Sequence, residues 1–279
     1  MSCLLIKPCC TRVKDMAMMM GKHKSRKDYP MIIRFLRGLE LSVAFVAVFA
    51  ATCFSIPEGF VYLDEQDKTI QASVRYFSTE NFVGARVDGY KAARIVITKQ
   101  AAQALSKVQK ELLENGYSLV VYDAYRPQKA VNHFMRWSED LNDQAMKAKY
   151  YPKIDKRNVF DRGYVAKKSG HTRGSTIDLS IIKVDGKLKA PIFALRSVKG
   201  CETLPFLDDG TVDMGSSWDL LDQASHHSSP KVADECATQR NYLRTKMEKQ
   251  GFRAYEQEWW HYTLNNEPFP DTYFDFDIE

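Results

Sequence analysis

The chain has 279 residues, of which 44% are hydrophobic and 12% aromatic, so it can bury one substantial core and is not largely disordered. Its net charge of +5 comes from the N-terminal region, because residues 1–40 hold nine Lys or Arg and three Asp or Glu and so carry a charge of +6. Residues 41–279 therefore carry a net charge of −1. A nearly neutral domain without a basic stripe argues against a nucleic-acid partner.

An N-terminal leader is predicted over residues 1–56. Its basic stretch precedes an uncharged apolar run, residues 41–56, that ends in small residues, which is the pattern of a secretory signal peptide. The run is shorter than the roughly 20 residues of a usual spanning helix, and Met31 offers a simpler translation start. We expect export, to the periplasm. The alternatives are an uncleaved membrane anchor, with membrane association through the leader only, or a cytoplasmic location.

The first long helix is predicted after Thr98, which looks like its cap. Apolar residues then recur at helical spacing until Gly116 ends the helix. Residues 118–122 are typical of a buried strand. Pro127 begins a second helix, in whose first turn its missing N–H does no harm, and this helix runs to about Trp137.

The second half of the chain continues without a strict alternation of strands and helices. The expected elements are a strand over 176–182, an irregular stretch over 183–216, a helix over about 234–249, and two closing strands over 252–255 and 260–264. No linker divides residues 57–279. We therefore predict a single α+β domain, with a largely antiparallel sheet flanked by helices.

The segment Ser169-Gly-His-Thr-Arg-Gly-Ser-Thr-Ile-Asp178 is the first candidate for chemistry. Gly170 and Gly174 permit a tight backbone around His171, and Asp178 lies on the strand that follows. An imidazole nitrogen and a carboxylate oxygen are suitable zinc ligands. Spacing alone favours the alternative, a loop histidine with Asp178 paired to a surface cation.

The segment Glu258-Trp-Trp-His261 is the second candidate. A carboxylate beside a zinc-bound water is the usual general base of a metallohydrolase, and the aromatic neighbours supply a dry wall. Positions i and i+3 of a regular strand face opposite sides, so Glu258 must lie on a loop or bulge to share a site with His261. A core histidine bonded to a backbone carbonyl is the open alternative.

Arg126 lies between the predicted strand and the helix that begins at Pro127. From such a rigid junction a guanidinium can stabilise an oxyanion or bind a carboxylate, although a structural salt bridge is the commoner case. The three segments together supply three ligands with an open fourth position, one base and one cation. These are the components of metal-assisted amide hydrolysis.

A wider set of motifs resembles the VanX-type D-alanyl-D-alanine dipeptidases, zinc peptidases related to D-alanyl-D-alanine carboxypeptidases and to the Hedgehog signalling domain. The similarity spans nearly all of the chain after the leader. The motifs that carry it are Tyr62-Leu-Asp-Glu65, Tyr125-Arg-Pro127, Ser169-Gly-His171, Arg173-Gly-Ser-Thr-Ile-Asp178, Met214-Gly215, Ser225-His-His227, Glu258-Trp-Trp-His-Tyr262 and Tyr273-Phe-Asp-Phe276. It implies a Hedgehog/D-Ala-D-Ala peptidase-like fold.

The resemblance also implies the reaction. One zinc ion per chain would be held by His171, Asp178 and His261, and a zinc-activated water would attack D-alanyl-D-alanine and release two D-alanines. Glu258 would act as general base and then as general acid. Arg126 would stabilise the tetrahedral oxyanion.

The resemblance further implies that both charged ends of a small D,D-dipeptide are bound. Asp219, helped by Tyr76, would pair with the ammonium, and Ser169 would help to hold the carboxylate. A longer peptide would leave a buried charge unpaired, which explains dipeptide selectivity. The chain departs from the family at Gly170, where a second Ser is expected. His226 and His227 fall outside the metal site.

Two other functions stay open. One is a D,D-carboxypeptidase that trims longer wall peptides, against which the ammonium pocket argues. The other is a non-catalytic, zinc-stabilised binding module, in which Glu258 and Arg126 are dispensable. An exported dipeptidase would serve cell-wall turnover, whereas a cytoplasmic one would deplete a wall precursor and favour glycopeptide resistance.

An insertion of about twenty residues is expected around residues 183–213, by comparison with the family. It contains Cys201, one of the two cysteines that follow the leader; the other is Cys236. Two cysteines in an exported domain can pair. We therefore predict a disulfide that pins the insertion, with two unrelated buried thiols as the alternative.

Overall fold

The computed structural model describes residues 56–200 and 202–279, all within one compact unit. The leader predictions lie outside the described residues, apart from Ile56, and so does Cys201 with its predicted disulfide to Cys236. No helix in the described part of the chain is long and apolar enough to cross a membrane.

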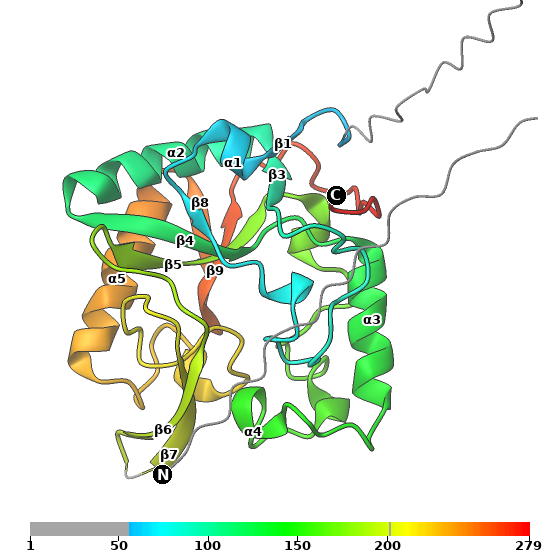
Figure 1. Cartoon of the computed structure of the whole chain (residues 1–279), viewed down its shortest axis with the longest axis vertical. Coiled ribbons are helices and arrows are strands. Elements are labelled where there is room, and N and C mark those ends of the chain that lie inside the picture. Colours follow the sequence, from blue (N-terminus) through cyan, green and yellow to red (C-terminus); the bar gives the residue numbers. More distant parts are fainter. Residues whose placement is uncertain (1–55, 201) are drawn as a thin grey trace, which may run out of the picture. The chain divides into compact units, whose positions relative to one another are not determined.

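The elements alternate irregularly along the chain (Figure 1). The strands are β1 (Phe60–Tyr62), β2 (Gln71–Ala72), β3 (Val96–Thr98), β4 (Tyr117–Asp123), β5 (Thr176–Lys183), β6 (Ile192–Val198), β7 (Glu202–Asp208), β8 (Phe252–Tyr255) and β9 (Glu258–Leu264). The α-helices are α1 (Leu63–Gln66), α2 (Lys99–Glu114), α3 (Gln128–Glu139), α4 (Lys147–Tyr150) and α5 (Asp234–Lys249). The 3₁₀ helices of the described residues are η1 (Arg75–Phe77), η2 (Lys156–Asn158), η3 (Gly170–Arg173) and η4 (Gln223–Ser225).

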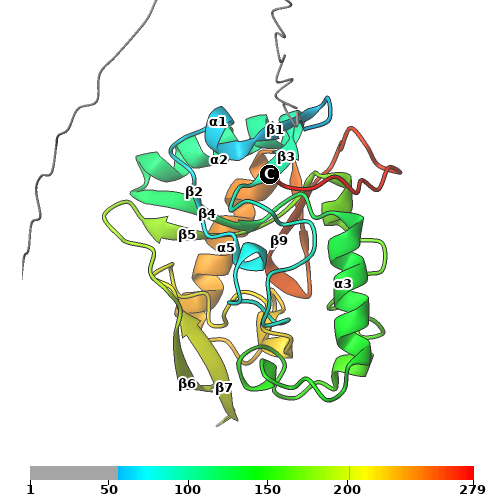
Figure 2. The ribbon, with the colours of Figure 1, turned by 45° about the vertical axis from the view of Figure 1, so that its right-hand side comes forward.

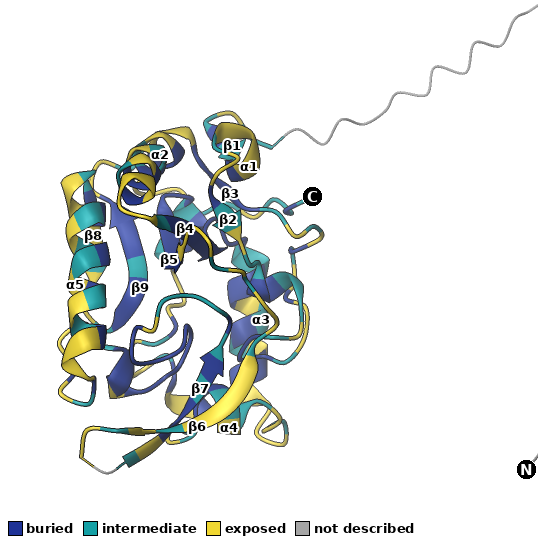
Figure 3. Ribbon diagram, turned by 60° about the vertical axis from the view of Figure 1, so that its left-hand side comes forward, coloured by how far each residue is buried: buried dark blue, intermediate teal, exposed yellow. Residues whose placement is uncertain are grey.

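A five-stranded sheet with the order β2-β4-β5-β9-β8 forms the centre of the described unit. Only the β2–β4 pairing is parallel, so the predicted α+β class with a largely antiparallel sheet is confirmed. Helices α2 and α5 lie next to each other on one side of the sheet, and α3 lies on the other side (Figures 1 and 2). The central strands β5 and β9 are largely buried (Figure 3).

Helix α2 forms where the periodicity predicts it, because its buried side chains make one stripe: Ala101, Ala102, Leu105, Val108, Gln109 and Leu112. Thr98 is the N-cap residue of α2, as predicted, although its hydroxyl makes no capping bond and instead lies 2.6 Å from Ser175 Oγ. Pro127 precedes α3 as its N-cap residue and does not occupy the first turn.

The prediction of an irregular stretch over residues 183–216 was also wrong. Strands β6 and β7 pair there as a regular antiparallel hairpin of seven residue pairs. Most of β6 is exposed on both faces, so the strand lacks the alternation of buried and exposed residues that sequence patterns detect (Figure 3). Pro205 within β7 also weakens the strand pattern.

One row of polar residues crosses the end of the central strands. Asp123 of β4 is the direct neighbour of Asp178 in β5, which in turn faces His261 of β9. Directly opposed residues in adjacent strands project to the same side of a sheet. The register of the sheet therefore gathers titratable side chains at one point on the face toward α3.

Candidate active site

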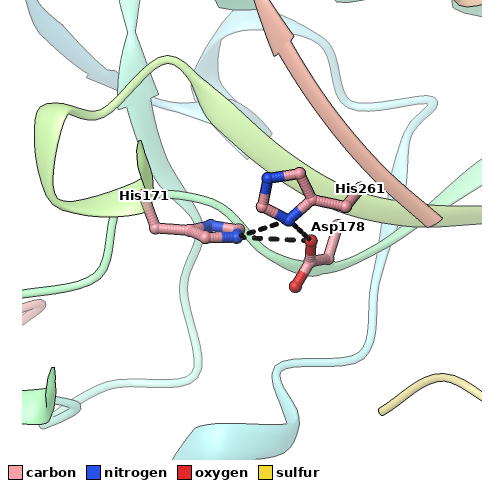
Figure 4. Close-up of side chains that lie close together, drawn as sticks. All are labelled: His171, Asp178 and His261. Atoms are coloured by element: carbon pink, nitrogen blue, oxygen red, sulfur yellow. Dashed lines mark hydrogen bonds and ion pairs between the residues drawn. The ribbon is translucent and has the colours of Figure 1, made fainter. Parts of the chain in front are cut away.

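His171, Asp178 and His261 point toward one another (Figure 4). Asp178 Oδ1 lies 3.1 Å from His261 Nδ1 and 3.3 Å from His171 Nε2, and the two nitrogens are 3.3 Å apart. Among the described residues this is the one cluster of at least three His, Cys, Asp or Glu side chains close enough to hold a metal ion.

The cluster fits a zinc ion. Tetrahedral zinc with bonds of about 2.0–2.1 Å to nitrogen and oxygen puts its ligand atoms about 3.3 Å apart, close to the separations observed. Asp178 is buried, and its Oδ1 faces the two imidazole nitrogens without a hydrogen bond of regular geometry to any of the described residues. A buried carboxylate oxygen without a partner is costly unless a cation completes it.

The charges of the cluster depend on one another. Burial by itself would raise the pKa of Asp178, but the adjacent His171 and His261 reverse the effect and lower it. Burial opposes protonation of His261, whereas contacts with Asp178 and Glu258 prevail and raise its pKa to about 9. Both shifts follow from the close approach of the imidazoles and carboxylates in this cluster.

The ring of His171 is fixed by its surroundings. Its Nδ1 lies 2.8 Å from the carbonyl oxygen of Ala124, to which it donates when Nε2 is the unprotonated nitrogen that faces the cluster. Gly174 closes the short helix η3 with φ of 83°, and a Cβ there would lie 2.2 Å from the Phe60 ring. The tight backbone expected around His171 is therefore present, and it requires glycine at position 174.

Glu258 shares the site because the strand pairing is irregular, as the sequence required. The β8–β9 register shifts between Ala254 and Tyr255, so that Tyr255 pairs with Glu258. Glu258 is buried, and its Oε2 lies 3.3 Å from His261 Nδ1. The carboxylate is therefore positioned beside the candidate metal centre.

Arg126 forms a structural salt bridge, the commoner of the roles that the sequence left open, and it also lines the cavity of the candidate site. Its Nε and Nη2 donate to Asp123 Oδ2 at 3.0 and 2.8 Å, a buried ion pair, and Tyr90 donates to Asp123 Oδ1 at 2.6 Å. The Arg126 Nη2 atom is also 3.8 Å from Asp178 Oδ2. The salt bridge thus holds the guanidinium at the candidate site.

Asp219 is a buried carboxyl group at an unusual backbone position, with φ of 59°. Tyr76 Oη donates to its Oδ2 at 2.7 Å. Burial, reinforced by the charges of Asp178 and Glu258, raises the pKa of Asp219 well above its usual value. No Lys, Arg or His in the described ranges lies within ion-pair distance of it, so this carboxyl has no cationic partner of its own.

A single cavity of about 230 Å³ is lined by all eight residues for which the sequence suggested roles. They are Tyr76, Arg126, Ser169, His171, Asp178, Asp219, Glu258 and His261. Ser169 Oγ also accepts a bond from the backbone N–H of His171 at 3.3 Å. Residues up to 185 positions apart in the chain, from Tyr76 to His261, thus meet at one point.

Other residues that contribute to the site were not identified from the sequence. Trp218 Nε1 donates to Asp178 Oδ2 at 3.4 Å, and Asp123 orients Arg126. Phe82 and Phe134 form apolar parts of the cavity wall. The position of Asp123, three residues before Arg126, was the one available signal, whereas nothing in the pattern marks the two phenylalanines.

His226 and His227 lie outside the metal-binding cluster, as expected. His227 is buried, and neither of its ring nitrogens has a hydrogen-bond partner among the described residues. Burial, helped by the charge of Arg244, lowers the pKa of His227 to about 4. The ring is therefore neutral in the folded protein at pH 6, where an unfolded histidine is largely protonated.

The buried ring of His227 is expected to make stability fall in acid. Between pH 6.5 and 4 the unfolded chain binds a proton that the folded chain does not, so the free energy of unfolding falls as the pH falls through this window. The contribution is about 3 kcal/mol, from a pKa lowered from 6.5 to about 4. Urea unfolding at pH 7 and pH 4 should give a smaller pH difference for His227→Phe than for wild type, and equal differences would contradict this origin.

The three candidate metal ligands open on the cavity that also holds Glu258 and Arg126, which is the arrangement expected of a metal-dependent hydrolase. Comparison with known sequences narrows the class. The peptidase M15 family, described as D-ala-D-ala dipeptidase, matches residues 57–190 and 194–279, and the chain belongs to this family.

Individual relatives agree with the family. The chain is 39% identical over 222 residues to the D-alanyl-D-alanine dipeptidase of Enterococcus faecium, an alignment that covers 79% of this chain and 98% of the relative. It is 42% identical over 220 residues to the protein of the same name from Streptomyces coelicolor, covering 78% and 98%. A third, from Escherichia coli, is 29% identical over 195 residues, covering 70% and 79%. The resemblance noted from the sequence is confirmed, and the chain is a metallopeptidase.

Proposed function

We propose that this protein is a zinc-dependent dipeptidase that hydrolyses D-alanyl-D-alanine to two D-alanines. The observation that carries the proposal is the single cavity in which all the side chains needed for this reaction meet. The names of the relatives support the substrate, because all three relatives described above are called D-alanyl-D-alanine dipeptidase.

His171, Asp178 and His261 would hold the zinc ion, one per chain. Two imidazoles, one carboxylate and an open fourth position are the donor set of catalytic zinc sites. When bound, zinc supplies a Lewis acid that polarises a carbonyl and lowers the pKa of water toward 7. The protein fixes the directions of these ligands through Ala124 O on His171 and Trp218 Nε1 on Asp178.

Glu258 moves the proton in the proposed reaction. Its buried carboxylate takes a proton from the attacking water and delivers it to the nitrogen of the leaving D-alanine. Arg126, held rigid by Asp123, donates hydrogen bonds to the oxyanion that develops on the carbonyl oxygen. A donor fixed in advance stabilises that charge without reorganisation.

Asp219 and Tyr76 bind the ammonium end of the dipeptide. The carboxyl of Asp219 is buried without a cation, and a substrate ammonium supplies the missing charge. Ser169 lines the same cavity and holds the carboxylate end. Selection at both ends restricts the enzyme to short, free dipeptides, since a blocked amine leaves Asp219 unpaired.

The ammonium pocket predicts strong discrimination against a blocked amine. The kcat/KM for D-alanyl-D-alanine should exceed that for its N-acetyl derivative by at least about 100-fold, because a site built around a polar group rejects the analogue that lacks it. Release of D-alanine from both substrates provides the measurement. Comparable values would support the D,D-carboxypeptidase instead.

The leader suggests where the reaction takes place. A basic stretch followed by an apolar run favours an exported enzyme in cell-wall peptide turnover over a cytoplasmic one in glycopeptide resistance. We place the leader at residues 1–56 and the dipeptidase domain at residues 57–279, with the insertion around 183–213. We also propose that the fold is related to that of the Hedgehog domain. A non-catalytic, zinc-stabilised binding module is the alternative to the dipeptidase function.

A further inference from the structure

The stretch of residues 214–226, here called the Asp219 segment, reaches the cavity through Asp219, which lines it. It carries Trp218, which donates to the metal-binding residue Asp178, and Asp219, which accepts from Tyr76. Its one regular element is the short helix η4. Asp219 has a positive φ, a conformation that is unfavourable for an L-residue and persists only when surrounding contacts enforce it.

Arg240, in the middle of α5, supplies such contacts. Its side chain is fully buried, with 0% of its surface exposed. The Nε atom donates to Met214 O at 2.6 Å, and Nη1 donates to His226 O at 2.6 Å. The Nη2 atom donates to Ala224 O at 2.8 Å and to Ser216 Oγ at 3.2 Å. One guanidinium therefore joins both ends of the Asp219 segment.

The surroundings of Arg240 are unusual for a buried charge. No carboxylate in the described ranges lies within ion-pair distance of its guanidinium, and all four acceptors are neutral oxygens of the Asp219 segment. Burial lowers the pKa of Arg240 to about 10. An apolar side chain of similar length would fill the same space without this desolvation cost. The charge therefore needs an explanation beyond packing.

Arg240 also acts on the half of the segment that approaches the cavity. Ser216, which it contacts, accepts a second bond from Trp259 Nε1 at 3.0 Å, and Ser217 Oγ accepts from the backbone N–H of Leu207 at 2.6 Å. These bonds immediately precede Trp218 and Asp219 in the chain. The backbone that presents the Asp219 carboxyl to the cavity is thus fixed by Arg240 of α5 together with Trp259 of β9 and Leu207 of β7.

We propose that Arg240 is a positioning residue for substrate recognition, which holds the Asp219 segment so that the Asp219 carboxyl meets the substrate ammonium. The inference rests on the proposed function, since it assigns Asp219 to the ammonium. Arg240 does not line the cavity. In this proposal it nevertheless controls the selectivity for a substrate with a free amine.

The test compares Arg240→Met with wild type at saturating zinc. The kcat/KM for D-alanyl-D-alanine should fall at least about tenfold, while that for the N-acetyl derivative, measured at high enzyme concentration, should change less than about threefold. Arg244→Met is the matched control, because Arg244 lies one turn further along α5 and pairs at the surface with Glu248 and Glu256. It should leave both values unchanged.

A double-mutant cycle with Asp219→Asn separates positioning from general damage. If Arg240 acts through Asp219, adding Arg240→Met to Asp219→Asn should lower the discrimination no further. If Arg240→Met fails to fold, Ser216→Ala takes its place, because it removes only one acceptor of the Arg240 guanidinium. The ratio of kcat/KM for D-alanyl-D-alanine to that for the N-acetyl derivative should then fall, by less than is expected for Arg240→Met.

Three outcomes are decisive. Equal losses of kcat/KM for both substrates, or the same ratio of the two kcat/KM values as in Arg244→Met, would overturn the role of Arg240 while leaving the proposed dipeptidase activity intact. Additive losses in the cycle would overturn it as well. Absence of D-alanyl-D-alanine hydrolysis by the wild-type protein would instead contradict the proposed function.

Discussion

Replacing Glu258 by glutamine is expected to lower kcat for D-alanyl-D-alanine by about 10³-fold, within the range that general acid–base catalysis contributes. Glutamine keeps the volume of the side chain and its contact with the cavity, but it cannot accept and return a proton. The three metal ligands are untouched, so the zinc content should stay at one ion per chain. Steady-state kinetics with metal analysis of the same sample provides the measurement.

Glu256→Gln is the matched control for this substitution. Glu256 lies two residues earlier and pairs with Arg244 at the surface, so its loss should leave kcat unchanged. A Glu258→Gln protein with full activity and full zinc would mean that Glu258 is not the base. A wild-type protein that binds zinc and shows no hydrolysis would favour the non-catalytic binding module.

The elements of the domain could be predicted where the burial of a helix or strand follows a recognisable pattern. Helix α2 has one apolar stripe, and β4 and β5 are rich in apolar residues and buried along almost their whole length, so pattern and structure agree there. The β6–β7 hairpin escaped prediction because most of β6 is exposed and its pairing depends on β7 alone. The burial of the residues in β6 follows no regular alternation, so no sequence pattern indicates this strand.

The candidate site could not be predicted from local sequence patterns alone. Residue types and local spacing left each of His171, Asp178 and His261 with a plausible structural role, because which strands become neighbours is not a local property. The β5–β9 pairing makes Asp178 and His261 direct partners, and this pairing joins segments 83 residues apart. Family resemblance supplied that long-range information, and the sheet register explains it physically.

The contacts that Trp218 and Arg240 make around the site could not be predicted from the sequence. Trp218 reaches Asp178 and Arg240 reaches the Asp219 segment through contacts that depend on the fold of loops without regular structure. A buried tryptophan or arginine in a sequence is usually a core or salt-bridge residue. Only the distances in the folded chain distinguish these two from that common case.

Removal of the metal is expected to reduce hydrolysis of D-alanyl-D-alanine to the background rate. Dialysis against a strong chelator takes away the cation that Asp178 Oδ1 and the two imidazoles are arranged to bind, and one equivalent of zinc per chain should restore activity. Magnesium should not restore it, because magnesium prefers six oxygen ligands and this site offers two nitrogens.

The same experiment has a readout that is independent of catalysis. An ion that binds the folded site and not the unfolded chain raises the thermal unfolding temperature by mass action, so zinc should stabilise the apoprotein in proportion to its affinity. Asp178→Asn removes the one anionic ligand at nearly constant volume and should abolish most of this shift. Full activity at a zinc content below about a twentieth of an equivalent would contradict the metal mechanism. An unfolding temperature that does not change with zinc would contradict the site itself, because three candidate ligands whose donor atoms already lie 3.1–3.3 Å apart need little reorganisation to bind the ion.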